Sequence, residues 1–443
     1  MKHASFVCSS CGKPYVKWAG QCSSCGSWST IVEYESSING LKKDIKKPSL
    51  LSSIVLDRQI DRFVTSINEF DRVLGGGIVR NSAILLAGMP GVGKSTLLLM
   101  IADALANQSI VLYVSSEESV EQIKSRSERV LLYNSDKFFI THETDLSSIL
   151  AVIESVNPDL VILDSLQNAS IENAYLSMHI NTIKQAAHML VEHTRKFNYT
   201  LLCTCHVTKD GEIAGPKALE HIVDVILYFE AASEGNLRIL RSNKNRFGRT
   251  DEAGFFIMQE KGIDSCPDPQ QILIEHKDPT VGSALSWYVE GSRLFLVEVQ
   301  ALINQTRMGN PQRVIHGIDH KQLILVCAVL EKYLKIPLYE YDIFCKVSGS
   351  IKLKDSQTDL ALAASLVSSY LGTVLKEKIV FSGEIGLSGD ITSRGLPSSC
   401  DVFKRYGVNK VAVSQLPDQL KSPREIDIVE LKSIYGLVKL FKS

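Results

Sequence analysis

The chain has 443 residues, of which 45% are hydrophobic and 22% are charged, which is an ordinary globular composition. Its length exceeds what one hydrophobic core supports, so two or three domains are expected. The 48 Lys and Arg residues nearly balance the 49 Asp and Glu residues, so overall charge cannot attract a polyanion and any nucleic-acid contact needs a local patch. No apolar run approaches the roughly 18 residues of a membrane span, and the N-terminus lacks a signal-peptide core. We therefore expect a cytoplasmic protein without a membrane partner.

Two C-x-x-C pairs lie near the N-terminus, and each pair ends in Cys-Gly. Cys8 and Cys11 form the first pair, and Cys22 and Cys25 form the second. Four thiolates at this spacing are typical of a tetrahedral zinc site. A redox-active pair or two disulfides are the alternatives, but a reducing compartment and the repeated Cys-Gly ending argue against both. The sequence thus predicts a structural Zn2+ ion that allows residues 1–34, a small zinc finger, to fold.

The residues around these pairs give less information. Lys13, Lys17 and Trp18 lie between the pairs and have the chemistry to contact nucleic acid or another domain, and the sequence favours neither. Residues 35–60 are rich in Ser and Lys and show no sustained hydrophobic period, which predicts a flexible linker.

From about Phe63 the pattern changes to short apolar stretches that alternate with helix-length amphipathic segments. This rhythm is typical of a mainly parallel sheet with helices on both faces. We therefore expect an α/β domain over residues 61–268. The expected strands are SAILLAG (82–88), SIVLYVS (109–115), DLVILDS (159–165), TLLCTC (200–205) and DVILYFE (224–230).

The first of these strands leads directly into GMPGVGKST, which matches G-x-x-x-x-G-K-[ST] between a strand and a helix. Backbone N–H groups of such a turn surround phosphate oxygens, while Lys94 would reach the β- and γ-phosphates and Ser95 would bind Mg2+. A Gly-rich turn without function is the alternative, which the strand, loop and helix in register disfavour. We predict a nucleoside triphosphatase whose nucleotide-binding residues are Gly88, Met89, Pro90, Gly91, Val92, Gly93, Lys94, Ser95 and Thr96.

Acidic side chains at two further strand ends complete the predicted catalytic set with Lys94. Asp164 follows four apolar residues and is expected to help hold Mg2+, although an Asp in this place also caps helices. Glu117 and Glu118 end the strand that follows the phosphate-loop helix. At least one of them should face the γ-phosphate. Helix capping by SSEES is the other interpretation, and it suits Glu118 while Glu117 orients the attacking water.

A cluster of cations occurs in NKNRFGRT, residues 243–250. Counted from Arg238, five positive side chains precede the first acid, Asp251. The preceding LRILRS alternates apolar and charged residues like an exposed edge strand, and most short charge runs are solvated surface. Residue type alone therefore favours a surface without a specific role.

Several strings together resemble the RadA (Sms) family of bacterial DNA repair proteins. VLGGGIV, GMPGVGKST, YVSSEES, LVILDS, CHVTKDGEIAGPKALEHIVD and KNRFG occur in the order and spacing of that family, which also has the four-cysteine finger. The resemblance covers essentially the whole chain, and KNRFG and HVTKDGEIAGP are rare strings. It implies a RecA-like ATPase core, hexameric rings and a DnaB-like motor that uses ATP to promote branch migration. The implied partners are single-stranded and branched DNA and the RecA recombinase.

The same resemblance implies roles for individual residues. His206 would sense the γ-phosphate and couple it to the loop at 209–217, where Lys209 and Lys217 would contact DNA. Without the resemblance, a strand-end His is as often a satisfied core residue. Cys205 departs from the family, which usually has Gly before that His, and it would alter the local backbone or the sensor without abolishing nucleotide binding.

The KNRFG string takes on a different meaning in the light of the resemblance. In ring ATPases a cation at this point can reach across the subunit boundary toward the γ-phosphate of a neighbour. Lys244 and Arg246 would act in trans in this way, contact DNA phosphates, or do both. The cluster thus becomes the candidate coupling element between ATP and DNA.

Residues 269–443 have their own organisation, which resembles the α+β protease domain of Lon that the RadA family carries. The periodicity predicts an amphipathic helix in 320–338, a strand in 341–353, a buried helix in 355–371 and a hairpin pair of strands in 378–392. The expected fold is therefore an α/β P-loop core preceded by a zinc finger and followed by an α+β domain.

An ATP-dependent Lon-like peptidase or peptide-binding module is the alternative function. A Lon-type site needs a Ser nucleophile and a Lys that deprotonates it. Alignment on SGEIGLSGDI puts Thr358 near the nucleophile position and Pro397 or Ser398 near the Lys position, so proteolysis is not expected. Lys352 and Lys354 would line a duplex-binding surface or a solvated strand. A RecA-like signalling ATPase without motor action is a third possibility.

Overall fold

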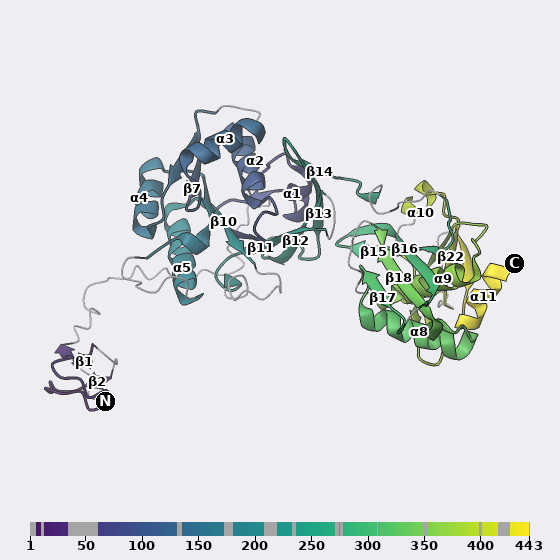
Figure 1. The fold of residues 1–443 in the computed structure, drawn as a ribbon. Coiled ribbons are helices and arrows are strands. Elements are labelled where there is room, and N and C mark those ends of the chain that lie inside the picture. Colours follow the sequence, from purple (N-terminus) through teal and green to yellow (C-terminus); the bar gives the residue numbers. More distant parts are fainter. Residues whose placement is uncertain are drawn as a thin grey trace, which may run out of the picture. The chain divides into compact units, whose positions relative to one another are not determined.

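Figure 1 shows the fold of the chain in a computed structural model. Its contacts divide the chain into two compact units, Met1–Gln59 and Ile60–Ser443. The described residues are 6–9, 13–33, 61–130, 135–171, 180–207, 219–232, 236–270, 274, 278–307, 309–348, 353, 355–397, 401–414 and 426–442. Several predictions concern residues outside these ranges, namely the linker at 35–60, Cys11, Lys209, Lys217, Lys352, Lys354 and Ser398.

The N-terminal unit contains a small antiparallel sheet with strand order β2-β1-β3. Its strands are β1 (Phe6–Cys8), β2 (Pro14–Tyr15) and β3 (Ile31–Glu33). The buried apolar cluster consists of Cys8, Cys22 and Ile31, with Phe6, Tyr15 and Ala19 packed against it. So small a core stabilises little by itself, which agrees with a unit that needs a metal to fold.

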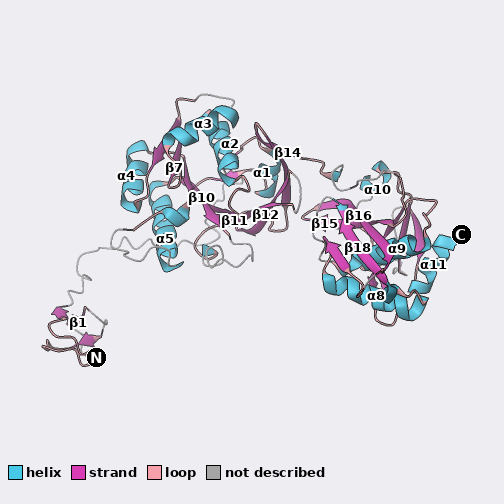
Figure 2. Ribbon diagram, in the orientation of Figure 1, coloured by secondary structure: helices cyan, strands magenta, loops and turns pink. Residues whose placement is uncertain are grey.

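The second unit contains a sheet with strand order β14-β13-β12-β11-β6-β10-β9-β7-β8, which forms the centre of residues 61–265 (Figure 2). Neighbours from β11 to β8 are parallel, and β12, β13 and β14 extend the sheet in antiparallel fashion. The prediction of a mainly parallel α/β core is confirmed. The strands are β6 (Ala83–Gly88), β7 (Val111–Ser115), β8 (Phe138–His142), β9 (Leu160–Asp164), β10 (Thr200–His206), β11 (Val225–Ala231), β12 (Leu237–Asn245), β13 (Ala253–Gln259) and β14 (Gly262–Ser265).

Helices cover both faces of this sheet because side chains alternate along each strand. Ile84 and Leu86 of β6 pack into the cluster that includes α2, whereas Ala83 and Leu85 pack with α4 and α5. The elements around the sheet are α1 (Asn68–Val73), α2 (Lys94–Ala106), α3 (Val120–Val130), α4 (Leu146–Val156), α5 (Ile180–Phe197), the short pair β4 (Arg62–Phe63) and β5 (Ile78–Val79), and the 3-10 turn η2 (Leu166–Asn168). None of the helices in the described ranges is long and apolar enough to span a bilayer.

Strand β12 lies inside the sheet, so the interpretation of LRILRS as an exposed edge strand is wrong. β12 pairs with β11 on one side and with β13 on the other. Its charged residues alternate because Leu237, Ile239 and Leu240 are buried while Arg238 and Arg241 are half-buried and paired. Alternation of apolar and charged residues indicates that one face of a strand makes polar contacts. It does not show whether the strand lies at the edge or in the interior of the sheet.

The C-terminal part contains a sheet of strand order β17-β18-β16-β15-β19-β22-β23, with α8, α9 and α11 contributing to one core. The two predicted helices and the strand between them occur within the expected ranges, although α8 ends at Leu334, β18 ends at Val347 and α9 begins at Asp359. The bounds are β15 (Ser283–Glu290), β16 (Arg293–Gln305), β17 (Arg313–His316), α8 (His320–Leu334), η3 (Leu338–Glu340), β18 (Tyr341–Val347), η5 (Ser356–Thr358), α9 (Asp359–Leu371), β19 (Ile379–Phe381), β20 (Glu384–Ile385), β21 (Ile391–Thr392), α10 (Asp401–Arg405), β22 (Lys410–Val413), β23 (Asp427–Glu430) and α11 (Ile434–Lys442).

The hairpin predicted in 378–392 differs from the observed structure. A hairpin forms only between the two-residue strands β20 and β21, while β19 joins the large sheet in parallel with β15 and β22. All three residues of β19 are buried. A strand covered on both faces has no alternation, so its sequence does not identify its partner.

The turn between β15 and β16 is tied to α1 and β13 by a buried carboxylate. Glu69 is 2% exposed and accepts hydrogen bonds from Arg293 (2.7 and 3.1 Å), Arg72 and the backbone N–H of Phe255 (2.9 Å). Phe255 also packs edge-on against Phe295 of β16. Because a buried carboxylate requires such partners, these contacts hold the turn against the ATPase sheet.

Candidate nucleotide site and its coupling elements

The predicted phosphate loop lies between β6 and α2, at the carboxyl edge of the parallel strands. Two of its glycines are required, Gly88 by packing against backbone and Gly93 by its backbone conformation. A Cβ on Gly88 would lie 2.4 Å from the carbonyl oxygen of Phe229, and one on Gly93 would lie 2.4 Å from Cε of Met258. Gly93 also has φ = 109°, which side chains other than glycine rarely adopt. Close packing and backbone conformation thus specify glycine at both ends of the turn.

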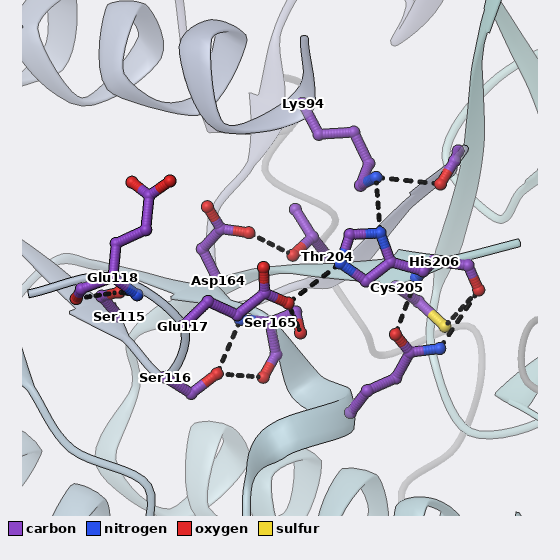
Figure 3. Close-up of polar contacts among 12 residues, drawn as sticks. Lys94, Ser115, Ser116, Glu117, Glu118, Asp164, Ser165, Thr204, Cys205 and His206 are labelled. Carbon is purple, nitrogen blue, oxygen red and sulfur yellow. Dashed lines mark hydrogen bonds and ion pairs between the residues drawn. The ribbon is translucent and has the colours of Figure 1, made fainter. Parts of the chain in front are cut away.

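Lys94 is buried, and its amine is held by acceptors of the protein (Figure 3). Nζ donates to the carbonyl oxygens of Gly88 (2.8 Å) and Met89 (3.1 Å) and lies 3.1 Å from Nδ1 of His206. Burial lowers the pKa of Lys94, and the charges of Asp164 and Glu117 act in the opposite direction. A cation with only neutral acceptors in direct contact is suited to an incoming phosphate.

Asp164 ends β9 and is fixed by hydroxyl groups from the two neighbouring strands. Its Oδ2 accepts a hydrogen bond from Tyr113 (2.7 Å), and its Oδ1 accepts one from Thr204 (2.6 Å). Burial, followed by the charge of Asp164, raises the pKa of Tyr113 well above its ordinary value. These contacts do not resemble a helix cap. Sequence reasoning missed both hydroxyls, although Thr204 shares a strand face with His206 at a spacing of two residues.

The two glutamates after β7 have different surroundings. Oε1 of Glu117 accepts a hydrogen bond from Ser165 (2.6 Å) and lies 2.9 Å from Nε2 of His206. Glu118 instead pairs with Arg126 at 2.5 Å. The structure therefore brings Glu117, and not Glu118, together with Lys94. Ser165 was not singled out from the sequence, although it directly follows Asp164.

His206 links the buried lysine to this glutamate, and the contacts fix its tautomer. The ammonium group of Lys94 can only donate, so Nδ1 of His206 accepts and Nε2 carries the proton that is donated to Glu117. The side-chain amide of Gln167 bonds both the backbone N–H and the C=O of His206 at 3.1 Å. Burial raises the pKa of Cys205 to about 11, so its thiol stays protonated beside His206.

The cations of KNRFG hold the start of β11. Nζ of Lys244 donates to the carbonyl oxygens of Val223 (2.7 Å) and Glu220, and Arg246 pairs with Asp224 at 2.9 Å. Burial, and then the charge of Arg246, lowers the pKa of Lys244. The residues that they contact follow the undescribed segment 208–218, which itself begins two residues after His206.

The strand register separates these cations from the phosphate loop of their own chain. Asn245 pairs with Val225, which is aligned with Ile84 near the amino end of β6. The phosphate loop begins at Gly88, four residues further on, or about 13 Å at the rise of a strand. Lys244 and Arg246 therefore lie away from the phosphate loop of their own chain, and their contacts within the described residues are with Glu220, Val223 and Asp224.

The thiols of Cys8, Cys22 and Cys25 converge in the N-terminal unit. Their sulfur atoms lie within 4.8 Å of one another, and those of Cys8 and Cys25 are 3.7 Å apart, too far for a disulfide. The hydroxyl of Tyr15 donates to the sulfur of Cys22 at 3.1 Å. Converging thiols suit a soft or borderline metal ion. The predicted fourth ligand, Cys11, lies outside the described residues.

The region aligned with the Lon active site shows a different set of partners. Thr358 is buried, and its hydroxyl donates to the carbonyl oxygen of Asp355 (2.8 Å) and accepts from the amide of Gln322 (3.3 Å). The same amide donates to Asp359 at 2.5 Å. Within the described ranges, the contacts of Thr358 include no lysine.

Asp359 predicts a pH dependence of stability. Burial raises its pKa from 3.8 to about 6, so the folded protein retains a proton there that the unfolded chain releases. The contribution of Asp359 to the free energy of unfolding should therefore be largest below pH 4 and fall by about 2–3 kcal/mol as the pH rises to 6. Urea unfolding of wild type and Asp359→Asn at pH 4.5–7.5 measures this: the stability of wild type relative to the variant should fall with rising pH.

Asp427→Asn serves as the matched control, because Asp427 is exposed at the start of β23. Its stability difference from wild type should change little over the same range. A pH-independent difference for Asp359→Asn would show that this carboxyl group titrates normally.

Comparison with known proteins agrees with these features. Residues 6–33 match the family model described as rubredoxin metal binding domain, and residues 51–212 match the model described as AAA domain. The thiol cluster thus lies in a metal-binding domain, and the phosphate loop lies in an ATPase domain.

Curated relatives match most of the chain. The DNA repair protein RadA of Bacillus subtilis strain 168 is 39% identical over 402 residues, covering 88% of this chain and 87% of the relative. RadA of Rickettsia conorii is 42% identical over 456 residues, covering 99% and 100%. RadA of Streptococcus pyogenes serotype M6 is 40% identical over 448 residues, covering 99% and 98%. The chain belongs to the family of the DNA repair protein RadA.

Proposed function

We propose that this protein is a DNA-stimulated ATPase that binds single-stranded DNA and uses ATP hydrolysis to drive branch migration of recombination intermediates. The observation that carries the proposal is the contact chain from Lys94 through His206 to Glu117. Its central residue, His206, lies two residues before the segment 208–218, which contains the proposed DNA contacts Lys209 and Lys217. A change in that segment therefore has a short covalent path to the groups that would surround the γ-phosphate.

The residues of the site divide the proposed hydrolysis among them. Lys94 would bind the β- and γ-phosphates, and Ser95 with Asp164 would hold Mg2+, which neutralises phosphate charge when bound with ATP. Tyr113 and Thr204 keep the carboxylate of Asp164 in one orientation. Glu117 would orient the attacking water.

His206 would control when Glu117 is available. In the present arrangement Oε1 of Glu117 accepts hydrogen bonds from Ser165 and from His206, so these two contacts hold the carboxylate in place. A phosphate that takes over the amine of Lys94 removes the donor to Nδ1 of His206. The ring then has fewer contacts to hold it, and movement of the following segment on DNA would release Glu117. Hydrolysis would thereby depend on DNA.

A ring assembly fits the positions of the KNRFG cations. Lys244 and Arg246 would not contact the nucleotide of their own chain, because they lie near the amino ends of the parallel strands, whereas the phosphate loop lies at the carboxyl ends. In a hexameric ring they would face a neighbouring subunit or the DNA that the ring encloses. The proposed setting is the cytoplasm, with RecA recombinase and branched DNA as partners and a structural Zn2+ ion bound by Cys8, Cys11, Cys22 and Cys25.

Peptidase activity is the other candidate, and the contacts of Thr358 do not favour it. The purified protein should hydrolyse ATP faster with single-stranded DNA, because DNA would release Glu117, and it should leave casein intact. Release of inorganic phosphate measures the ATPase rate, and gel analysis measures cleavage of casein. Casein cleavage with an ATPase rate indifferent to DNA would contradict the proposal. DNA-stimulated hydrolysis without any remodelling of branched DNA would indicate a signalling ATPase instead.

Substitution of His206 tests the control of Glu117. His206→Ala removes the hydrogen bond that occupies Glu117, so the ATPase rates with and without single-stranded DNA should become equal within about twofold. Nucleotide affinity should stay within a few-fold of wild type, because Lys94 keeps its carbonyl contacts. Steady-state hydrolysis and binding of a fluorescent ATP analogue measure the two quantities.

His188→Ala is the matched control, since His188 is an exposed histidine of α5 that pairs with Glu192. It should retain the stimulation of the wild type. If His206→Ala also retained it, His206 would not couple DNA to hydrolysis.

A further inference from the structure

Two tryptophans are exposed on the N-terminal unit. Trp18 is 63% exposed and Trp28 is 71% exposed. The chain has only three tryptophans, and the third, Trp287, packs against Phe403 with ring centroids 5.7 Å apart. Large apolar rings left in water are a mark of a contact surface. The smallest unit of the protein therefore carries two of its three largest aromatic side chains outside any core.

Gly20 brings the two rings onto one surface. A Cβ on Gly20 would lie 3.7 Å from Cζ3 of Trp28 and 3.9 Å from Cη2 of Trp18. Both rings thus lie next to the backbone of Gly20. In the sequence, Trp18 precedes the pair Cys22 and Cys25, and Trp28 follows it. The two exposed rings, with Gly20 between them, form an aromatic patch.

The charges around the patch indicate the chemistry of its partner. Lys13 and Lys17 are exposed on the same small unit, and Glu33 at the end of β3 is its one acidic residue within the described ranges. Lys13 makes a hydrogen bond to the neutral Ser23 at 3.2 Å, and neither lysine has an ion pair within the described residues. Exposed aromatic rings and cations on the same small unit match nucleobases joined by phosphates. A duplex does not fit, because its base faces are already stacked on one another.

We propose that Trp18 and Trp28 form a stacking site for the bases of single-stranded DNA, with Lys13 and Lys17 contacting the phosphates. This inference rests on the proposed function, and it adds a DNA contact outside the ATPase sheet. A second contact on the same chain raises the effective affinity for a strand already held by the first. The N-terminal unit would then help retain DNA while the ATPase site turns over.

Tryptophan fluorescence tests the stacking directly. The full-length zinc-loaded protein carrying Trp287→Phe has only Trp18 and Trp28 as emitters. Addition of an oligo(dT) strand should quench this emission, whereas the same length of duplex should quench it much less. Anisotropy of a labelled oligo(dT) strand, recorded in the same samples, reports DNA binding independently of the rings.

Substitutions then measure the contribution of the rings. Trp18→Ala and Trp28→Ala should each weaken oligo(dT) binding about fivefold or more, as expected for loss of a stacked base. Trp18→Phe and Trp28→Phe should restore most of the affinity. The exposed Val16 and Val32 of the same unit supply the control, and Val16→Ala with Val32→Ala should leave binding unchanged. Zinc content equal to that of the parent confirms that the unit remains folded.

The possible negative results of these experiments lead to different conclusions about the stacking site and the proposed function. If oligo(dT) binds by anisotropy without quenching, and the alanine variants bind as tightly as the parent, the stacking site is refuted while the proposed function stands. Equal quenching by duplex also refutes it. If no variant and no parent protein binds oligo(dT), the proposed function fails and the inference fails with it. Quenching only by a protein partner would assign the patch to protein recognition instead.

Discussion

The ammonium group of Lys94 can donate hydrogen bonds but cannot accept them, and this constraint orders the whole nucleotide site. Nδ1 of His206 must accept from it, so Nε2 must donate, and the acceptor that it meets is Glu117. The lysine of the phosphate loop and the proposed water-orienting glutamate are therefore connected through one imidazole ring. Any ligand that engages Lys94 changes the hydrogen bonding of that ring, and any movement of the ring changes Glu117.

Sheet topology extends this connection beyond the site. β10 and β11 both run parallel to β6, so the chain that leaves the carboxyl edge at His206 must return to the amino edge before Val225. Its return is fixed by Lys244 and Arg246 through Glu220, Val223 and Asp224. The segment between these anchors contains Lys209 and Lys217. A strand of DNA that contacts it would act on both ends, namely His206 and the KNRFG cations.

The sequence predicted those features that depend on local pattern. Hydrophobic periodicity and fixed spacing predict the parallel core, the phosphate loop and the cluster of cysteine thiols. The positions of Asp164 and Glu117 at strand ends predict their place in the candidate site. The hydroxyls that orient Asp164 could not be predicted, because Tyr113 and Thr204 come from strands that are adjacent only in the folded sheet. Likewise, the interior position of β12 and the separation of Lys244 from the phosphate loop depend on strand register. The apolar run of β19 carried no information about its partners.

Reciprocal binding of nucleotide and DNA tests this coupling most directly. The affinity of wild-type protein for single-stranded DNA is measured with and without a non-hydrolysable ATP analogue and Mg2+, and the affinity for the analogue is measured with and without DNA. The account predicts that each ligand changes the affinity of the other by the same factor, about fivefold or more, because both act on the contacts of His206. Affinities that are independent of each other would contradict it.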